Sequence, residues 1–137
     1  MEAVLKTHEE AGRTVTLLAS TSGVLALFAV ADTIKDSSKA AITELKDLGV
    51  TPVMLTGDNA ATAKALAVQA GIDDARGNLL PEDKLAAIKD MQQRYGATGM
   101  SGDGINDAPA LAQADIGFAM GGMGTYIAME AADVVIM

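Results

Sequence analysis

A ten-residue stretch, Gly102 to Leu111, combines the residue types that chemistry on a phosphate would need. Its carboxylates, Asp103 and Asp107, are four residues apart, and Asn106 lies between them. Glycines on both sides of Asp103 allow a sharp turn and a close approach of the backbone to a ligand. Acidic oxygens, a tight turn and the start of a helix together suit a magnesium–phosphate site. Asp103 would ligate the metal, and Asn106 and Asp107 would hold the loop and its waters.

A second candidate element, Thr56-Gly57-Asp58-Asn59, follows a predicted strand over residues 50–55. A hydroxyl and a glycine amide at the carboxyl end of a strand are well placed to bind a phosphoryl oxygen. Asp58 or Asn59 would cap the helix that continues to Ala70. Taken alone, the string also fits a plain strand-to-helix turn with a good cap.

The third candidate is a lysine in the first turn of a predicted helix. Pro81 suits the start of that helix. A cation at Lys84 is unusual there, because a helix N-terminus is already positive, and the pair makes sense if both face one anion. The spacing alone favours the alternative, a solvated lysine balanced by Glu82 and Asp83. The buried face of this helix would consist of Leu85, Ile88 and Met91.

These strings together resemble the P-type ATPases of the haloacid dehalogenase superfamily, and most of all their heavy-metal-transporting branch. The resemblance rests on residues 102–111 and 56–58 and on Leu80 to Lys84. It continues through Ala114 to Met120 and Glu130 to Met137. It covers nearly the whole chain, from about residue 2 onward.

The resemblance implies a role for each candidate residue. Thr56 and Gly57 would bind the transferred phosphoryl group, Lys84 would neutralise it, and Asp103 would hold Mg²⁺. The supporting residues would be Asp58, Asn106 and Asp107. Lys35 stands where the family usually has an arginine, so any contact with nucleotide phosphates there is weakened by loss of the bidentate guanidinium fork. The implied cofactor is Mg²⁺, and ATP would be the substrate of the complete protein.

One motif of the family, Asp-Lys-Thr-Gly-Thr with its phosphorylated aspartate, does not occur in these 137 residues. By resemblance, residues 1–31 correspond to the tail of the nucleotide-binding domain and residues 32–137 to the second part of the phosphorylation domain. The partners would be the rest of the same ATPase, including its actuator and membrane domains. We therefore expect an inactive isolated chain. The complete protein would be an ATP-driven exporter of a zinc-, cadmium- or lead-like cation, with this region at the cytoplasmic face of the cell membrane.

Two other functions stay open. One is a stand-alone magnesium-dependent phosphatase of the same superfamily with Asp32 as nucleophile, since Asp32 follows an apolar strand as that role requires. Against it, Ile34 stands where such phosphatases usually have a general acid. The other is a non-catalytic module that binds magnesium or phosphate, or docks on a partner.

The composition excludes several classes of function. A net charge of −8 without a basic run argues against nucleic-acid binding. The absence of cysteine excludes disulfides and thiolate metal sites, and the single His8 cannot build a zinc site alone. The longest apolar run, Gly23 to Ala31, is far shorter than the roughly 20 residues of a membrane helix, so we expect no span in this chain and a soluble fold.

The pattern of elements predicts an α/β fold, a haloacid-dehalogenase-like (Rossmann-like), mostly parallel sheet with helices on both faces, preceded by a short helix and a β-hairpin. Predicted strands cover 14–19, 24–31, 50–55, 97–101, 116–120 and 134–136. Predicted helices cover 2–11, a segment capped by Asp36 or Ser37 that runs to Leu48, one that ends at Ala70, one from Pro81, 105–114 and 125–131. Residues 72–80 would be a connection and 121–124 a turn.

A missing central strand would leave a gap between the strands that end at Leu55 and Ser101. Either the strand Val24 to Ala31 fills that gap, or the isolated chain is unstable or dimerises, because unpaired strand edges are costly and sticky.

Overall fold

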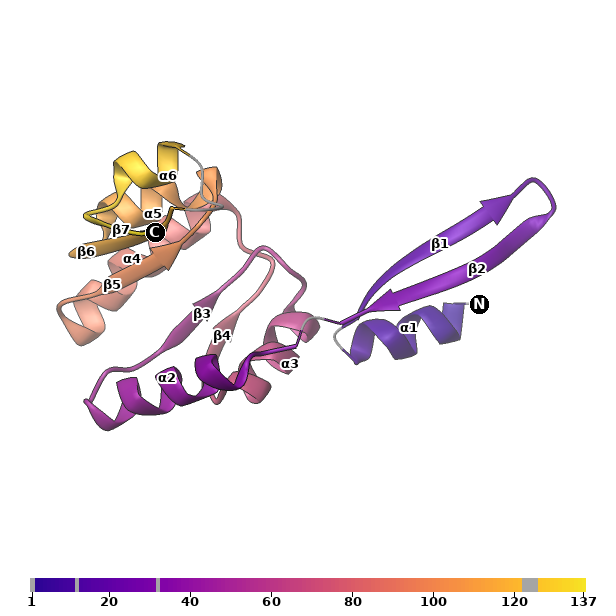
Figure 1. Ribbon diagram of the computed structural model, residues 1–137, viewed down its shortest axis with the longest axis horizontal. Helices are drawn as coiled ribbons and strands as arrows, with labels where there is room; N and C mark the ends of the chain where they lie inside the picture. The colour runs from indigo at the N-terminus through magenta and orange to yellow at the C-terminus, as the bar shows by residue number, and fades with distance from the viewer. Residues whose placement is uncertain (1, 12, 32, 122–125) are drawn as a thin grey trace. The chain divides into compact units, whose positions relative to one another are not determined.

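The computed structural model describes residues 2–11, 13–31, 33–121 and 126–137. The chain divides into two compact units, Met1–Asn78 and Leu79–Met137, and each is described by itself (Figure 1). The boundary predicted between residues 31 and 32 falls inside the first unit, and the assignment of its two sides to two domains of an ATPase stays a prediction.

The first unit begins with helix α1 (Glu2–Glu10) and an antiparallel hairpin of β1 (Thr14–Ser20) and β2 (Gly23–Val30) (Figure 1). Gly23 has a φ of 136° at the turn, a conformation that glycine adopts without steric cost. The predicted helix and hairpin are confirmed. Among the described strands β2 pairs only with β1, so the idea that it moves into the main sheet is wrong.

The first unit continues with α2 (Asp36–Asp47), β3 (Val53–Leu55), α3 (Ala60–Ala70) and β4 (Asp74–Arg76). Strands β3 and β4 pair in parallel, with Leu55 opposite Arg76. Strand β4 lies in the segment predicted as a connection. The sequence Asp-Ala-Arg contains no β-branched or aromatic residue, so its pattern carries no strand signal.

Helix termini in this unit follow the predicted chemistry in one case and depart from it in another. Asn59 caps α3, because its side chain accepts a hydrogen bond from the Thr62 N–H at 2.9 Å. Gly71, with φ at 78°, ends the helix as expected. The predicted cap of α2 by Asp36 or Ser37 is wrong, since Lys35 occupies the cap position and makes no side-chain cap bond.

The core of the first unit is thin. Its buried hydrophobic side chains, among the residues described, are Ala63, Ala67 and Ala70, which recur along one side of α3. Small side chains at this spacing let the helix backbone approach strand β4 closely. Helix α2 buries none of its residues, and Leu48 at its end is 80% exposed.

The second unit contains α4 (Pro81–Tyr95), β5 (Gly99–Gly102), a short 3-10 helix (Ile105–Asp107), α5 (Ala108–Gln113), β6 (Ile116–Met120), α6 (Tyr126–Ala131) and β7 (Val134–Ile136). Its three strands form a parallel sheet in the order β5-β6-β7. Ile88 of α4 and Leu111 of α5 are its largest fully buried side chains. The segment predicted as one helix over residues 105–114 consists of two elements, the 3-10 helix and α5.

The single predicted sheet is replaced by separate small sheets, although its parallel strands with intervening helices are confirmed. Strand β3 pairs with β4, and β5 pairs with β6, so the strands that end near Leu55 and Ser101 are not paired with each other. This agrees with the predicted gap between them. Of the predicted turn at 121–124, residues 122–124 lie outside the described part of the chain.

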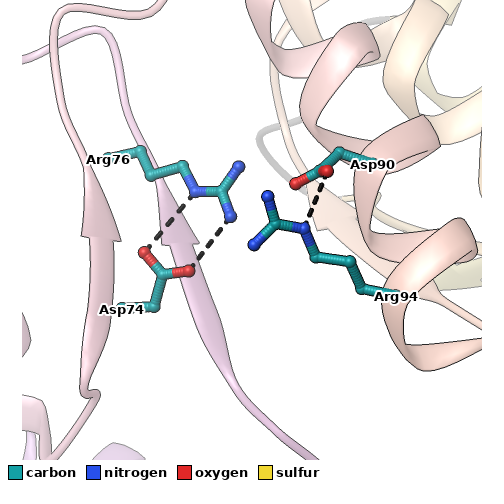
Figure 2. Close-up of polar contacts among 4 residues, drawn as sticks. All are labelled: Asp74, Arg76, Asp90 and Arg94. Atoms are coloured by element: carbon teal, nitrogen blue, oxygen red, sulfur yellow. Dashed lines mark hydrogen bonds and ion pairs between the residues drawn. The ribbon is translucent and has the colours of Figure 1, made fainter.

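Two ion pairs lie near the ends of β4 and α4 (Figure 2). On β4, Arg76 donates from Nε and Nη2 to the two carboxylate oxygens of Asp74, at 3.5 and 3.1 Å. On α4, Arg94 Nε donates to Asp90 Oδ1 at 2.8 Å, one helical turn away. Local pairs of this kind, partly exposed to water, contribute roughly 0–1 kcal/mol each.

Candidate functional site

The turn Thr56–Asp58 follows the carboxyl end of β3, as predicted. Its first and last residues are hydrogen-bonded to each other. The Thr56 hydroxyl donates to Asp58 Oδ2 at 3.0 Å and accepts a hydrogen bond from the Asp58 N–H at 3.1 Å. Thr56 is half-buried, whereas Gly57 and Asp58 are exposed. The carboxylate of Asp58 therefore fixes the orientation of the Thr56 hydroxyl, and the Gly57 backbone is open to solvent.

In the second unit, Lys84 and Asp107 form a mostly buried ion pair. The distance from Lys84 Nζ to Asp107 Oδ1 is 2.6 Å, and the side chains are 14% and 11% exposed. Asp83 accepts a hydrogen bond from the Leu80 N–H at the start of α4 instead. The alternative of a solvated lysine balanced by Glu82 and Asp83 is therefore wrong.

Asp107 joins this lysine to the loop that follows β5. Its second oxygen, Oδ2, accepts a hydrogen bond from the Gly104 N–H at 3.3 Å. A Cβ atom at Gly102 would lie 2.8 Å from Asp107 Cβ and 2.9 Å from its Oδ2. Glycine at position 102 thus allows the carboxylate of Asp107 to pack against the end of the strand. The close approach predicted for this glycine is, within this chain, an approach to Asp107.

Asp103 lies in the same loop but in a different environment. It is exposed, and within the described residues its carboxylate has no hydrogen-bond or ion-pair partner. Those residues contain no group of three or more His, Cys, Asp or Glu that could hold a metal ion. Mg²⁺ is usually held by one or two carboxylates plus waters and phosphate oxygens, so an exposed, unpaired Asp103 fits Mg²⁺. A cage made only of protein ligands, as structural zinc requires, does not fit.

A polar clamp holds β5 at the end opposite the Asp103 loop. Asp115 accepts hydrogen bonds from the Thr98 N–H at 2.8 Å and from Gln92 Nε2 at 3.1 Å. Gln92 and Gln113 are also hydrogen-bonded to each other. The bond from the Thr98 backbone, followed by that from Gln92, lowers the pKa of Asp115 below its ordinary value. The clamp links α4, β5 and the start of β6 by polar contacts.

Comparisons with known proteins add to this geometry. A family model described as a haloacid dehalogenase-like hydrolase matches residues 1–115. The chain belongs to this family. It is 49% identical over 136 residues to a copper-exporting P-type ATPase of Staphylococcus saprophyticus, which is 99% of this chain and 17% of that protein. A copper-exporting P-type ATPase of Staphylococcus aureus strain JH9 is 49% identical over 130 residues, covering 95% of this chain and 16% of that protein.

Solved structures of heavy-metal P-type ATPases are also similar to this chain. A zinc-transporting PIB-type ATPase in the E2P state matches with a TM-score of 0.83 at 43% identity, over 99% of this chain and 22% of that one. The same kind of ATPase in the E2.Pi state gives 0.82 at 44% identity, over 96% and 21%. This haloacid-dehalogenase-like chain thus corresponds to one region of heavy-metal P-type ATPases and spans 17% of the curated relative from S. saprophyticus. In the described residues no helix is long and apolar enough to cross a membrane.

The predicted site residues of this haloacid-dehalogenase-like chain fall into two groups. Lys84, Asp107 and the loop that carries Asp103 and Asn106 lie together in the second unit. The turn Thr56–Asp58 belongs to the first unit. The exposed Lys35 occupies the N-cap position before α2. Asp32, the alternative nucleophile, lies outside the described residues.

Proposed function

We propose that this chain is the part of a heavy-metal P-type ATPase that holds the phosphoryl group and Mg²⁺ while an aspartyl phosphate is formed and hydrolysed. The observation that carries the proposal is the mostly buried Lys84–Asp107 pair, in which Asp107 also holds the N–H of Gly104, the residue that follows the exposed Asp103. A fixed cation next to an unpaired anionic ligand suits a phosphate whose charge is shared between a lysine and a metal ion.

In this proposal Asp107 orders Lys84 before the phosphoryl group arrives. A free lysine side chain loses about 1.5–2 kcal/mol of rotamer freedom when it becomes fixed. Because the pair with Asp107 already fixes it, little of that cost remains at the moment of binding. An ammonium group has three N–H donors, and Asp107 uses one of them, so two are left for phosphoryl oxygens.

In the first unit, the turn Thr56–Asp58 would offer neutral donors to a phosphoryl group. Gly57 is exposed, and its N–H can donate to a phosphoryl oxygen. The Thr56 hydroxyl has one proton, which it gives to Asp58 Oδ2. To donate to a phosphoryl oxygen, the Thr56 hydroxyl must give up its hydrogen bond to Asp58 Oδ2, while its oxygen can still accept the hydrogen bond from the Asp58 N–H. In this proposal the hydroxyl therefore donates to Asp58 when no phosphate is bound and to the phosphoryl oxygen when it is.

Mg²⁺, when bound, supplies positive charge that offsets the charge of the phosphoryl oxygens. Asp103 is the residue of this chain that would hold it, with Asn106 orienting water in the same loop. The phosphorylated aspartate would come from another part of the complete protein, and ATP would be its substrate. That protein would have the remaining cytoplasmic and membrane domains as partners, with this region at the cytoplasmic face. We retain a zinc-like cargo as a prediction, since the similar proteins include copper and zinc transporters.

The proposal is tested in the complete protein that carries this segment, by measuring acid-stable phosphoenzyme formed from labelled ATP and Mg²⁺. We expect Lys84→Ala and Asp103→Asn each to slow phosphoenzyme formation by about 100-fold or more, since each removes charge stabilisation from the transferring group. The matched control is Lys89→Ala, an exposed lysine on the same helix, which should change little. Equal rates for Lys84→Ala and Lys89→Ala would reject the proposed role of Lys84.

A further inference from the structure

We propose that Gly77 and Asn78, which directly follow β4, are positioning residues for the phosphoryl-binding turn Thr56–Asp58. This inference rests on the function proposed above for Thr56 and Gly57. It extends the site to two residues that belong to none of the sequence motifs described above. They act through the backbone of the turn rather than by touching the phosphoryl group.

The last residue of β4 and the residues that follow it contact the turn at successive points. The Thr56 N–H donates to the carbonyl oxygen of Arg76 at 3.0 Å, and the Asn78 N–H donates to the carbonyl oxygen of Asp58 at 2.6 Å. Gly77 lies between these two hydrogen bonds in the chain. The residues before and after Gly57 are thus both tied to the same short segment.

Gly77 has no room for a side chain. A Cβ atom there would lie 2.8 Å from both the Asp58 carbonyl oxygen and Ala60 Cα, and 2.9 Å from the Ala60 amide nitrogen. These are backbone atoms, so they cannot move aside as the end of a flexible side chain can. Any other residue at position 77 would therefore displace the backbone of the turn or the first residue of α3.

Asn78, which makes the second of these hydrogen bonds, adopts a left-handed conformation. Its φ is 56°, and it is the single non-glycine residue with positive φ in the described part of the chain. Asparagine and aspartate tolerate this region better than other residues with a side chain. The Asn78 N–H makes the short hydrogen bond to Asp58, and the positive φ sets the direction in which the chain leaves this contact.

The consequence concerns Gly57, whose amide is the proposed phosphoryl donor. A glycine between two unrestrained residues samples many backbone directions. Here Thr56 and Asp58 are each anchored by a hydrogen bond, so the direction of the Gly57 amide is set before a ligand binds. Donors that need no reorientation contribute most to the stabilisation of a transferred group.

The first experiment measures the turn itself, in the 137-residue chain, by amide NMR and hydrogen exchange. We expect Gly77→Ala to shift the Thr56 and Gly57 amide resonances and to speed exchange of the Asn78 amide by about tenfold, since it breaks that hydrogen bond. The matched control is Gly71→Ala. Gly71 also lies in the first unit, has φ at 78° with open space around it, and lies at the far end of α3.

A second measurement separates positioning from general loss of stability. In the complete protein, phosphoenzyme can also form by the reverse of its hydrolysis, in which the aspartate and inorganic phosphate condense and release water. We expect Gly77→Ala to raise the KM for inorganic phosphate in that reaction by about tenfold or more, because a small misplacement of a binding group is costly. Gly71→Ala strains the backbone without touching the turn and should leave that KM nearly unchanged. Equal changes in both variants, or unshifted Thr56 and Gly57 amides in Gly77→Ala, would overturn the inference.

A milder pair of variants covers the case in which Gly77→Ala does not fold. Asn78→Ala should shift the same amides because alanine disfavours positive φ, whereas Asn78→Gly should restore them because glycine accepts it. Failure of Asn78→Gly to differ from Asn78→Ala would also overturn the inference. If the unaltered complete protein forms no phosphoenzyme, the proposed function fails, and the amide shifts still decide whether residues 77 and 78 hold the turn.

Discussion

At the scale of single residues, Asp103 and Asp107 show how one loop gives two aspartates opposite environments. Asp107 is mostly buried and paired with Lys84, and Asp103 is exposed and has no partner among the described residues. The environment of Asp107 suits a residue that stabilises the structure, and the environment of Asp103 suits a residue that is available to bind a cation. The two aspartates therefore make a matched pair for mutation.

We predict that Asp107→Ala lowers the free energy of unfolding by about 3 kcal/mol, because it leaves the mostly buried ammonium of Lys84 without its counter-ion. Asp103→Ala removes an exposed carboxylate from the same loop and should change stability by less than about 0.5 kcal/mol. Urea denaturation of both variants measures the difference. Similar losses in the two variants would contradict the distinct roles assigned to them.

Residue types and spacing indicated which segments to consider but not their contacts. The Gly102–Leu111 string indicated a metal and phosphate loop, and that role stays a prediction; in the structure Asp107 accepts a hydrogen bond from the Gly104 N–H of this loop. The contact between Lys84 and Asp107 could not be predicted from spacing, since the residues are 23 apart in sequence and on different elements. Gly77 and Asn78 gave no usable signal either, because a Gly-Asn pair after a segment without strand pattern indicates only a loop.

At the scale of elements, the polar clamp around Asp115 shows how β5 is held at the end away from the Asp103 loop. Asp115 receives hydrogen bonds from Thr98, just before β5, and from Gln92 on α4. Because these bonds favour the charged carboxylate, the pKa of Asp115 is lower in the folded chain than in the unfolded chain. The stabilisation is therefore present at neutral pH and is lost as the pH falls through the folded pKa.

We predict that Asp115→Asn is less stable than the unaltered chain at pH 7 and that this difference shrinks below about pH 4, where the carboxylate becomes protonated in the unfolded and then in the folded state. Urea denaturation at a series of pH values measures it. Asp103→Asn, which lacks such bonds among the described residues, serves as the control. A stability difference for Asp115→Asn that stays constant down to about pH 2 would contradict this account.

Elements with a strong hydrophobic period were predicted well, and those held by tertiary contacts were not. The helix from Pro81 and the strand Ile116–Met120 carry clear patterns and occur where expected. Strand β4 is defined by its pairing with β3, which no local pattern reveals. Lys35 is the N-cap residue of α2 and makes no side-chain cap bond, so the capping preferences of Asp36 and Ser37 did not decide that boundary.

At the scale of the whole molecule, the two units differ in how much they bury. The first has three buried alanines as its described hydrophobic core, and the second buries larger side chains, including Ile88 and Leu111. Strand β3 pairs with β4 alone, and β5 with β6 alone, so each of these two strands has an open edge in the described structure. Open edges and a thin core are consistent with a chain that is completed by other parts of a larger protein.

We propose that this chain supplies part of a phosphoryl-binding site whose nucleophile lies elsewhere in the complete protein. The measurement to make first is magnesium-dependent hydrolysis of a small aryl or acyl phosphate by the 137-residue chain, beside Asp32→Asn and Asp103→Asn. We predict no turnover above the uncatalysed rate for the unaltered chain or either variant. Turnover by the unaltered chain that both substitutions abolish would contradict the claim and would identify Asp32 as the nucleophile of a stand-alone phosphatase.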